Sequence, residues 1–183
     1  MESSNNIQPF KQHCPQLAKS VYAHQTASII GQVHIGENSS IWPSVVIRGD
    51  INFIRIGQNT NIQDLSILHV NHKSEQDPEG SPLIIGDNVT IGHAVILHGC
   101  SIADECLIGM GSIVMDKVVV QKQVLLGAGS LVPSGTLLES GYLYVGRPAK
   151  KVRALTAEEI ASLMESARSY VQVKDAYLAE NTT

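Results

Sequence analysis

The sequence predicts an all-β solenoid, in which short parallel strands wind into stacked coils, followed by one C-terminal α-helix. Three observations lead to this prediction. Apolar residues recur every six positions along most of the chain, and glycine often follows the apolar residue directly. Aromatic residues make up only 4% of the chain, so the core must consist of Val, Ile and Leu. These branched side chains suit a narrow and regularly layered interior.

The apolar residues of the six-residue period fall into runs that are separated by short slips. They are Ile29, Ile35, Ile41, Ile47, Phe53, Ile56, Ile62, Leu68, Ile85, Ile91, Leu97, Ile102, Ile108, Val114, Val120, Leu126, Val132 and Leu138. A period of six matches neither a helix nor a simple alternating strand. It fits a short strand plus a turn, and a chain that repeats this unit can wind into a parallel solenoid. A sandwich of short strands is the alternative, but a sandwich does not keep a six-residue phase over this length.

Two departures from the period are informative. Residues 71–82 are polar and rich in turn-forming residues, so we expect a loop that leaves the solenoid. The step from Leu97 to Ile102 is one residue short and lies beside two histidines, which indicates a site. Residues 1–16 carry no clear pattern and are expected to form an N-terminal arm. The solenoid is therefore assigned to residues 17–155.

Residues 156–183 are predicted to form an amphipathic helix with a short tail. Thr156 and Glu159 have the spacing of a capping box, which marks a helix start. Apolar residues then follow at helical spacing: Ile160, Leu163, Met164, Ala167, Tyr170, Val171 and Leu178. We expect this helix to cover an exposed surface of the solenoid or to contact a neighbouring subunit.

Composition excludes several classes of function. Thirteen basic and 17 acidic residues give a formal charge of −4, which argues against nucleic acid or an anionic membrane as a partner. No stretch reaches the roughly 18 apolar residues that a membrane span needs, and the N-terminus lacks a secretory signal pattern. The three cysteines, without C-x-x-C spacing, are typical of reduced thiols in a cytoplasmic protein.

The pattern of an apolar residue, glycine and four variable positions resembles the left-handed parallel β-helix family of hexapeptide-repeat proteins. In that family each coil consists of three hexads and the coils form a triangular prism. The handedness and the three-hexad coil are implied by this resemblance and do not follow from the period itself. Left-handed crossovers are uncommon in proteins.

Three of the seven histidines lie within the repeat. His69 and His98 each follow an inward apolar residue, and with three hexads per coil they stack on one face, one coil apart. Two stacked imidazoles can share a metal ion. His93 falls on another face, so it would reach this pair only from a neighbouring subunit, in a trimer packed face against face. The sequence thus predicts a three-histidine metal site at a subunit interface; ordinary surface histidines without a metal are the alternative.

Charged residues accompany these histidines. Arg48 belongs to the face of His69, and Asp64 belongs to the face of His93. Across a trimer interface they can meet as an arginine–carboxylate pair, and Asp50 can support Arg48. A purely structural interface salt bridge is an equally good interpretation of these three residues.

The constellation resembles the gamma-class carbonic anhydrases, in particular their YrdA-type branch, over about residues 10–178. The stretches that carry the resemblance are Ile41–Pro43, Val46–Asp50, Asn61–Asp64, Leu68–Val70, Ile91–His93, Leu97–Cys100 and Ser140–Gly146. The resemblance implies a homotrimer that hydrates carbon dioxide reversibly to bicarbonate.

The resemblance also implies a role for each site residue. His69 and His98 of one subunit and His93 of the next would bind the metal, and Gln63 would orient the metal-bound water. Arg48, Asp50 and Asp64 would form the interface network, with bicarbonate held near Arg48. Zinc suits three imidazoles, and iron(II) and cobalt(II) are alternatives.

Two positions depart from the family pattern. Ile51 replaces a glutamate that follows the Arg-x-Asp segment, and His72 replaces the glutamate that shuttles protons. Histidine can also carry protons near neutral pH, so His72 is the candidate shuttle. Because both glutamates are replaced, low activity is expected. A hexapeptide-repeat acyltransferase and a non-catalytic metal-binding trimer are the alternative functions.

Overall fold

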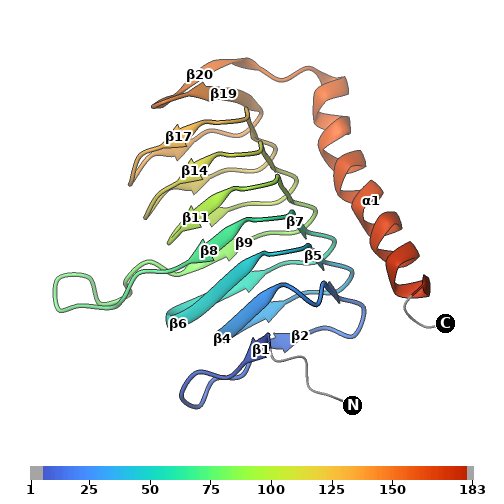
Figure 1. Ribbon diagram of the computed structural model, residues 1–183. Helices are drawn as coiled ribbons and strands as arrows, with labels where there is room; N and C mark the ends of the chain where they lie inside the picture. The colour runs from blue at the N-terminus through green and yellow to red at the C-terminus, as the bar shows by residue number, and fades with distance from the viewer. Residues whose placement is uncertain (1–5, 181–183) are drawn as a thin grey trace.

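The computed structural model describes residues 6–180, which form a parallel β-solenoid with one C-terminal helix (Figure 1). The predicted fold is confirmed. Successive coils stack strand on strand, and the coils form three columns of parallel strands. We call these columns the helix face, the histidine face and the third face.

The helix face is the column against which the C-terminal helix packs. Its strands are β3 (Tyr22–Ala23), β5 (Ser40–Ile41), β7 (Asn61–Ile62), β10 (Thr90–Ile91), β13 (Leu107–Ile108), β16 (Leu125–Leu126) and β19 (Tyr142–Gly146). An antiparallel strand, β20 (Ala149–Ala154), closes this sheet beside β19.

The other two faces are joined at the base of the stack, because two long strands bend from one into the other. These are β4 (Ser28–Ile35) and β6 (Val46–Ile56), and β1 (Ile7–Gln8) and β2 (Gln16–Leu17) both pair with β4. The histidine face continues with β8 (Ile67–His69), β11 (Ile96–His98), β14 (Ile113–Val114) and β17 (Leu131–Val132). The third face continues with β9 (Leu83–Ile85), β12 (Ser101–Ile102), β15 (Val119–Val120) and β18 (Leu137–Leu138).

Strand register shows that each coil holds three hexads. Ile108 pairs with Leu126 and Val114 pairs with Val132, eighteen residues further on in each case. The same register holds across the projecting loop, where Leu68 pairs with Leu97. Residues that share a position in the period therefore lie directly above one another.

The core consists of the inward residues of the period, together with the small or branched residues four places after them. Side chains such as Ile47, Leu68, Val45 and Ser39 have no exposed surface. The prediction was wrong at Phe53, which is only half-buried, whereas Ile54 is fully buried. The reason is a register shift between β4 and β6, which inserts three extra residues into β6. Ile29 and Ile35 of β4 are six residues apart, but their partners Ile47 and Ile56 are nine apart.

The segment between β8 and β9 projects from the solenoid as a loop (Figure 1). Asn71 and Ser81 form an antiparallel bridge at its base. The Asn52 side chain donates to the carbonyl oxygens of Asn71 and Glu79, at 3.1 and 2.9 Å. These contacts hold the base of the loop against β6.

The helix α1 (Ala157–Glu180) begins with the predicted capping box. The amide of Glu159 donates to Thr156 Oγ1 at 3.2 Å, and the amide of Thr156 donates to Glu159 Oε2 at 2.9 Å. The preceding residues differ from the expected repeat, because β19 and β20 form an antiparallel hairpin in place of further hexads.

From its start beside the last coils, α1 runs back along the helix face (Figure 1). Ser166 contacts Thr90 at 3.0 Å, and further along the Tyr177 ring packs 5.5 Å from that of Tyr22. The helix thus crosses several coils. Within residues 6–180, no helix is both long enough and apolar enough to cross a membrane.

Candidate metal centre

The two stacked histidines of the histidine face lie in contact. Strands β8 and β11 pair in parallel, with Leu68 beside Leu97 and His69 beside His98. Both leucines point into the core, so both imidazoles point outward. The Nδ1 atom of His69 lies 3.1 Å from Nε2 of His98, and the ring centroids are 5.1 Å apart.

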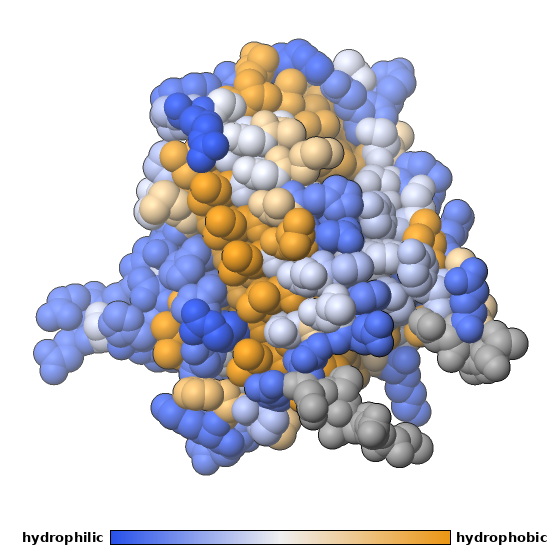
Figure 2. Space-filling view, viewed as in Figure 1, coloured by the Kyte–Doolittle hydropathy of each residue, from blue (hydrophilic) through white to orange (hydrophobic). Residues whose placement is uncertain are grey.

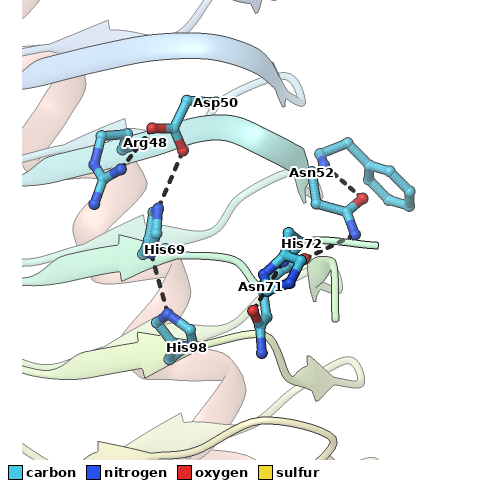
Figure 3. A network of polar contacts seen from close by, with 8 residues as sticks. Arg48, Asp50, Asn52, His69, Asn71, His72 and His98 are labelled. Atoms are coloured by element: carbon cyan, nitrogen blue, oxygen red, sulfur yellow. Dashed lines mark hydrogen bonds and ion pairs between the residues drawn. The ribbon is translucent and has the colours of Figure 1, made fainter. Parts of the chain in front are cut away.

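The second ring nitrogen of each of these histidines faces a carboxylate. His69 Nε2 lies 3.1 Å from Asp50 Oδ1 (Figure 3), and His98 Nδ1 lies 2.7 Å from Asp116 Oδ1. A carboxylate only accepts hydrogen bonds, so these two nitrogens carry the protons of the neutral rings. The nitrogens that face each other, at 3.1 Å, are then both acceptors. Two acceptors so close require a proton or a cation between them.

Asp50 joins Arg48 to the histidine pair. Its Oδ2 atom lies 2.5 Å from Arg48 Nη1, while Oδ1 faces His69. Burial raises the pKa of Asp50, but the hydrogen bonds from Arg48 and His69 outweigh it and lower the pKa below its ordinary value. Burial is also the largest influence on His69 and lowers its pKa. The lowered pKa of Asp50 favours its ionised form, and the lowered pKa of His69 favours its neutral form, which is the form that binds a metal.

His93 lies on a different face, at the start of the turn that follows β10. Its Nδ1 atom lies 2.9 Å from Asp64 Oδ2, because β7 and β10 pair with Ile62 beside Ile91. Its side chain is 47% exposed. Each of the three candidate ligands therefore has one ring nitrogen on an aspartate and the other available to a ligand.

Gln63 belongs to the side of His93 and not to the histidine pair. Its side chain is buried beside β7, and its Nε2 atom donates to Asn61 Oδ1 at 3.1 Å. Its backbone amide donates to the Ile91 carbonyl. One chain thus carries two groups: Arg48, Asp50, His69 and His98 on one face, and Gln63, Asp64 and His93 on the other.

One chain does not bring a complete ligand set together. Within residues 6–180, no three His, Cys, Asp or Glu side chains are grouped so that they could hold a metal ion. The histidine pair nevertheless fits a cation, since two ligand bonds of about 2.0–2.1 Å can span the 3.1 Å between the facing nitrogens.

His72 lies at the start of the projecting loop, next to Asn71 and Asn52 (Figure 3). Its side chain is exposed, and its backbone amide donates to Asn71 Oδ1 at 2.9 Å. The hydrogen bonds drawn in Figure 3 join the histidine pair to Asp50 and not to His72. Ile51, the other departure from the family pattern, is an exposed residue of β6.

Sequence analysis missed Asp116. Val114 stacks on Leu97 in the coil above His98, and Asp116 follows Val114 by two positions. Asp50 has a similar place in the coil below His69, where it follows Ile47 by three positions. Counting coils upward from His98 as well as downward from His69 would have found it.

Comparison with known proteins shows the family of the chain. Residues 82–115 match the model of the hexapeptide repeat of succinyl-transferase. The chain is 50% identical to Protein YrdA of Escherichia coli over 175 residues, which cover 96% of this chain and 95% of YrdA. It is also 48% identical to mitochondrial gamma carbonic anhydrase 1 of Arabidopsis thaliana, over 91% of this chain and 60% of that protein. The chain belongs to the gamma-class carbonic anhydrase-like family, in its YrdA branch.

The fold of this gamma-class carbonic anhydrase-like protein also has a solved counterpart. A hexapeptide transferase family protein from Anaplasma phagocytophilum superposes with a TM-score of 0.87 and 40% identity, over 93% of this chain and 96% of the other. Relatives with this solenoid thus carry names from two enzyme classes, carbonic anhydrase and transferase. The chemistry of the site must decide between the two.

Proposed function

We propose that this protein is a metal-dependent carbonic anhydrase-like enzyme that hydrates carbon dioxide reversibly to bicarbonate. The observation that carries the proposal is the contact between His69 Nδ1 and His98 Nε2, two acceptor nitrogens 3.1 Å apart. The two nitrogens would both hold a divalent cation, which would relieve their repulsion. An acyltransferase has no need of such a pair, because one histidine suffices as its base.

The third ligand in this proposal is His93 of a neighbouring subunit in a homotrimer. Within one chain His93 is on a different face from the pair, and half of its ring is exposed. The histidine face also carries a column of outward apolar residues that need a cover. Val46, Ile67, Ile96, Ile113 and Leu131 stack in register along it.

Two members of this apolar column, Ile67 and Ile96, are exposed by 44% and 38%. Figure 2 shows hydrophobic side chains gathered in a band along the stack of coils. An exposed apolar surface of this kind is typical of a subunit interface. The column lies beside the histidine pair, so a subunit that covers it would also approach the metal site.

The overall reaction converts carbon dioxide and water into bicarbonate and one proton. When bound, a divalent cation with three neutral ligands supplies hydroxide near neutral pH by lowering the pKa of its water to about 7. Gln63 would orient the attacking water by a hydrogen bond, and Arg48 would hold the bicarbonate anion. The proton must then reach solvent, for which His72 is the candidate carrier.

Zinc is the proposed metal, with iron(II) and cobalt(II) as alternatives. Imidazole nitrogens bind all three ions, and affinity alone does not select among them. The oxygen-sensitive alternative, iron(II), requires protein that is purified without air.

A non-catalytic metal-binding trimer is the second candidate function, and two observations favour it. Ile51 is apolar and cannot carry a proton, and within residues 6–180 no hydrogen bond joins the His72 side chain to the histidine pair. Both occupy positions at which the family has glutamates. With these two glutamates replaced, the protein would still bind its metal but would lose the proton of the reaction only slowly.

The test has two stages. Elemental analysis of protein purified without air measures the metal content, and isotope exchange between labelled carbon dioxide and water then measures hydration with zinc, cobalt or ferrous iron. Metal binding with exchange above background supports the enzyme. Metal binding without exchange supports the non-catalytic trimer, whereas no metal but acetyl-coenzyme A binding supports the acyltransferase.

A further inference from the structure

We propose that Asp116 is a positioning residue of the metal centre, which fixes the ring of His98 so that its Nε2 atom faces the metal. This inference rests on the proposed metal site and extends it. No comparison assigns a role to Asp116, and it acts through His98 and not on the substrate itself.

The contact is short and is built by the stacking of coils. Strand β14 stacks on β11 with Val114 beside Leu97, and the turn after β14 brings Asp116 over His98. The Asp116 Oδ1 atom lies 2.7 Å from His98 Nδ1. Among residues 6–180, His98 is the only ion-pair partner found for Asp116. The carboxylate is therefore directed at the imidazole.

Gly99 makes room for this carboxylate. A Cβ atom at Gly99 would lie 2.3 Å from Asp116 Oδ1 and 2.5 Å from the Ser81 Cβ. Gly99 also has a φ of +50°, which other residues adopt at a cost. The residue next to His98 thus has two reasons to be glycine, and one of them is the space that Asp116 occupies.

Lys117, the neighbour of Asp116, is engaged elsewhere. Its Nζ atom lies 2.6 Å from Asp77 Oδ2 in the projecting loop, and its amide donates to the Gly99 carbonyl at 2.7 Å. The hydrogen bond from the Lys117 amide to the Gly99 carbonyl fixes the backbone next to Asp116 against the coil below. The ammonium group binds the loop and leaves the charge of Asp116 to His98.

The chemical consequence concerns the tautomer of His98. The Asp116 carboxylate accepts a hydrogen bond from His98 Nδ1–H, so the proton stays on Nδ1 and the free lone pair is on Nε2, the atom that faces His69. The negative charge also makes the imidazole a stronger metal ligand. His69 has the same kind of contact with Asp50, and His93 has it with Asp64, so each of the three candidate ligands has one ring nitrogen hydrogen-bonded to an aspartate.

Zinc affinity of Asp116→Ala and Asp116→Asn variants, measured by competition with a chelator, tests this proposal. Asp116→Ala removes the acceptor, and we expect about 10- to 100-fold weaker zinc binding, the usual range for such partners. Asp116→Asn keeps an acceptor oxygen without its charge, so its loss should be smaller. Asp77→Asn is the matched control, because it breaks the Lys117 ion pair next to Asp116 but leaves His98 untouched.

Zinc binding by Asp116→Ala at wild-type strength would overturn the proposal, as would an equal loss in Asp77→Asn. If Asp116→Ala does not fold, ¹⁵N NMR of the zinc-loaded wild type decides, because the proposal requires zinc on Nε2 of His98 and a proton on Nδ1. Zinc on Nδ1 would refute it. Wild-type protein that binds metal but shows no isotope exchange would defeat the hydration activity alone, whereas wild-type protein that binds no metal would defeat both proposals.

Discussion

His69 and His98 face each other through nitrogens that are both acceptors, since the other nitrogen of each ring keeps its proton and donates a hydrogen bond to an aspartate. The arrangement is repeated at His93 and Asp64 on another face of the same chain. In the proposed trimer, three imidazoles with three carboxylates and one arginine would make a site whose charge a divalent cation would largely balance.

Replacing His93 should empty every metal site, because in the proposed trimer each site would take one His93 from a partner. In His93→Ala we expect the metal content to fall from about one ion per chain to less than about a tenth of that, since two ligands bind zinc far more weakly than three. Elemental analysis and size-exclusion chromatography measure metal content and assembly. His34→Ala, an exposed histidine of β4, serves as the control and should keep its metal. A full metal content in His93→Ala would show that the ligand across the interface is another residue.

Arg48→Ala should weaken the trimer or the hydration activity. Its guanidinium holds Asp50 at 2.5 Å, and Asp50 in turn holds His69. We expect at least about a tenfold loss in exchange rate or in trimer stability, because the variant removes the charged partner of Asp50 Oδ2 and leaves only the contact of Oδ1 with His69. Isotope exchange and analytical ultracentrifugation measure the two. An intact trimer with full activity would exclude both roles for Arg48.

A charge placed in the apolar column should disrupt assembly. Ile96 is 38% exposed on β11, beside the histidine pair, and we expect Ile96→Glu to be monomeric and depleted of metal. Light scattering measures the mass. Val119→Glu is the control, since Val119 is 45% exposed on the third face and its variant should assemble normally. Trimers of Ile96→Glu would mean that another face forms the interface.

Gly99→Ala should both destabilise the fold and weaken the metal site. A positive φ costs a non-glycine residue about 1–2 kcal/mol, and the new methyl group would also push against Asp116 and Ser81. Gly129→Ala separates the two effects, because Gly129 has a φ of +69° but, among residues 6–180 and apart from its two chain neighbours, no atom lies within 4 Å of the position that its new methyl group would take. Denaturant unfolding should show a loss in both variants, and zinc affinity should fall only in Gly99→Ala. Equal zinc affinity in the two variants would contradict the steric role.

The start of α1 should lose stability in acid. Hydrogen bonds from Arg153, and then from the Thr156 amide, lower the pKa of Glu159 to about 2, from an ordinary value of 4.5. The folded state therefore holds this proton less tightly than the unfolded chain. The stabilisation is complete above pH 4.5 and is lost as the pH falls toward 2.

Fluorescence of Trp42, the one tryptophan of the chain, can follow this loss, because Tyr170 and Tyr177 of α1 pack against its ring. Glu159→Gln keeps an acceptor for the Thr156 amide but has no charge to titrate. The acid transition of this variant should lack the part between pH 4.5 and 2. Identical acid profiles for the two proteins would show that the Glu159 carboxylate does not stabilise the helix.

The period of the sequence was enough to predict the solenoid, because a repeated hexad leaves few other ways to bury its apolar residues. It was also enough to stack His69 on His98 once three hexads per coil were assumed, since register then fixes which side chains meet. The sequence predicted Phe53 as an inward residue, but Ile54 is the buried one. The difference comes from a register shift between β4 and β6, and the sequence of one strand alone does not show where its pairing with another strand shifts. Asp116 was missed because its role appears only when the coil above the histidines is counted.

The position of α1 has a consequence for how the molecule unfolds. In a solenoid each coil contacts only the coils next to it, so the stack can fray from either end. The helix links β10 to Trp42 and to Tyr22 near the base of the stack, and these residues belong to different coils. The helix thereby couples coils that do not contact one another, and we expect the coils from β3 to β10 to unfold as one cooperative unit.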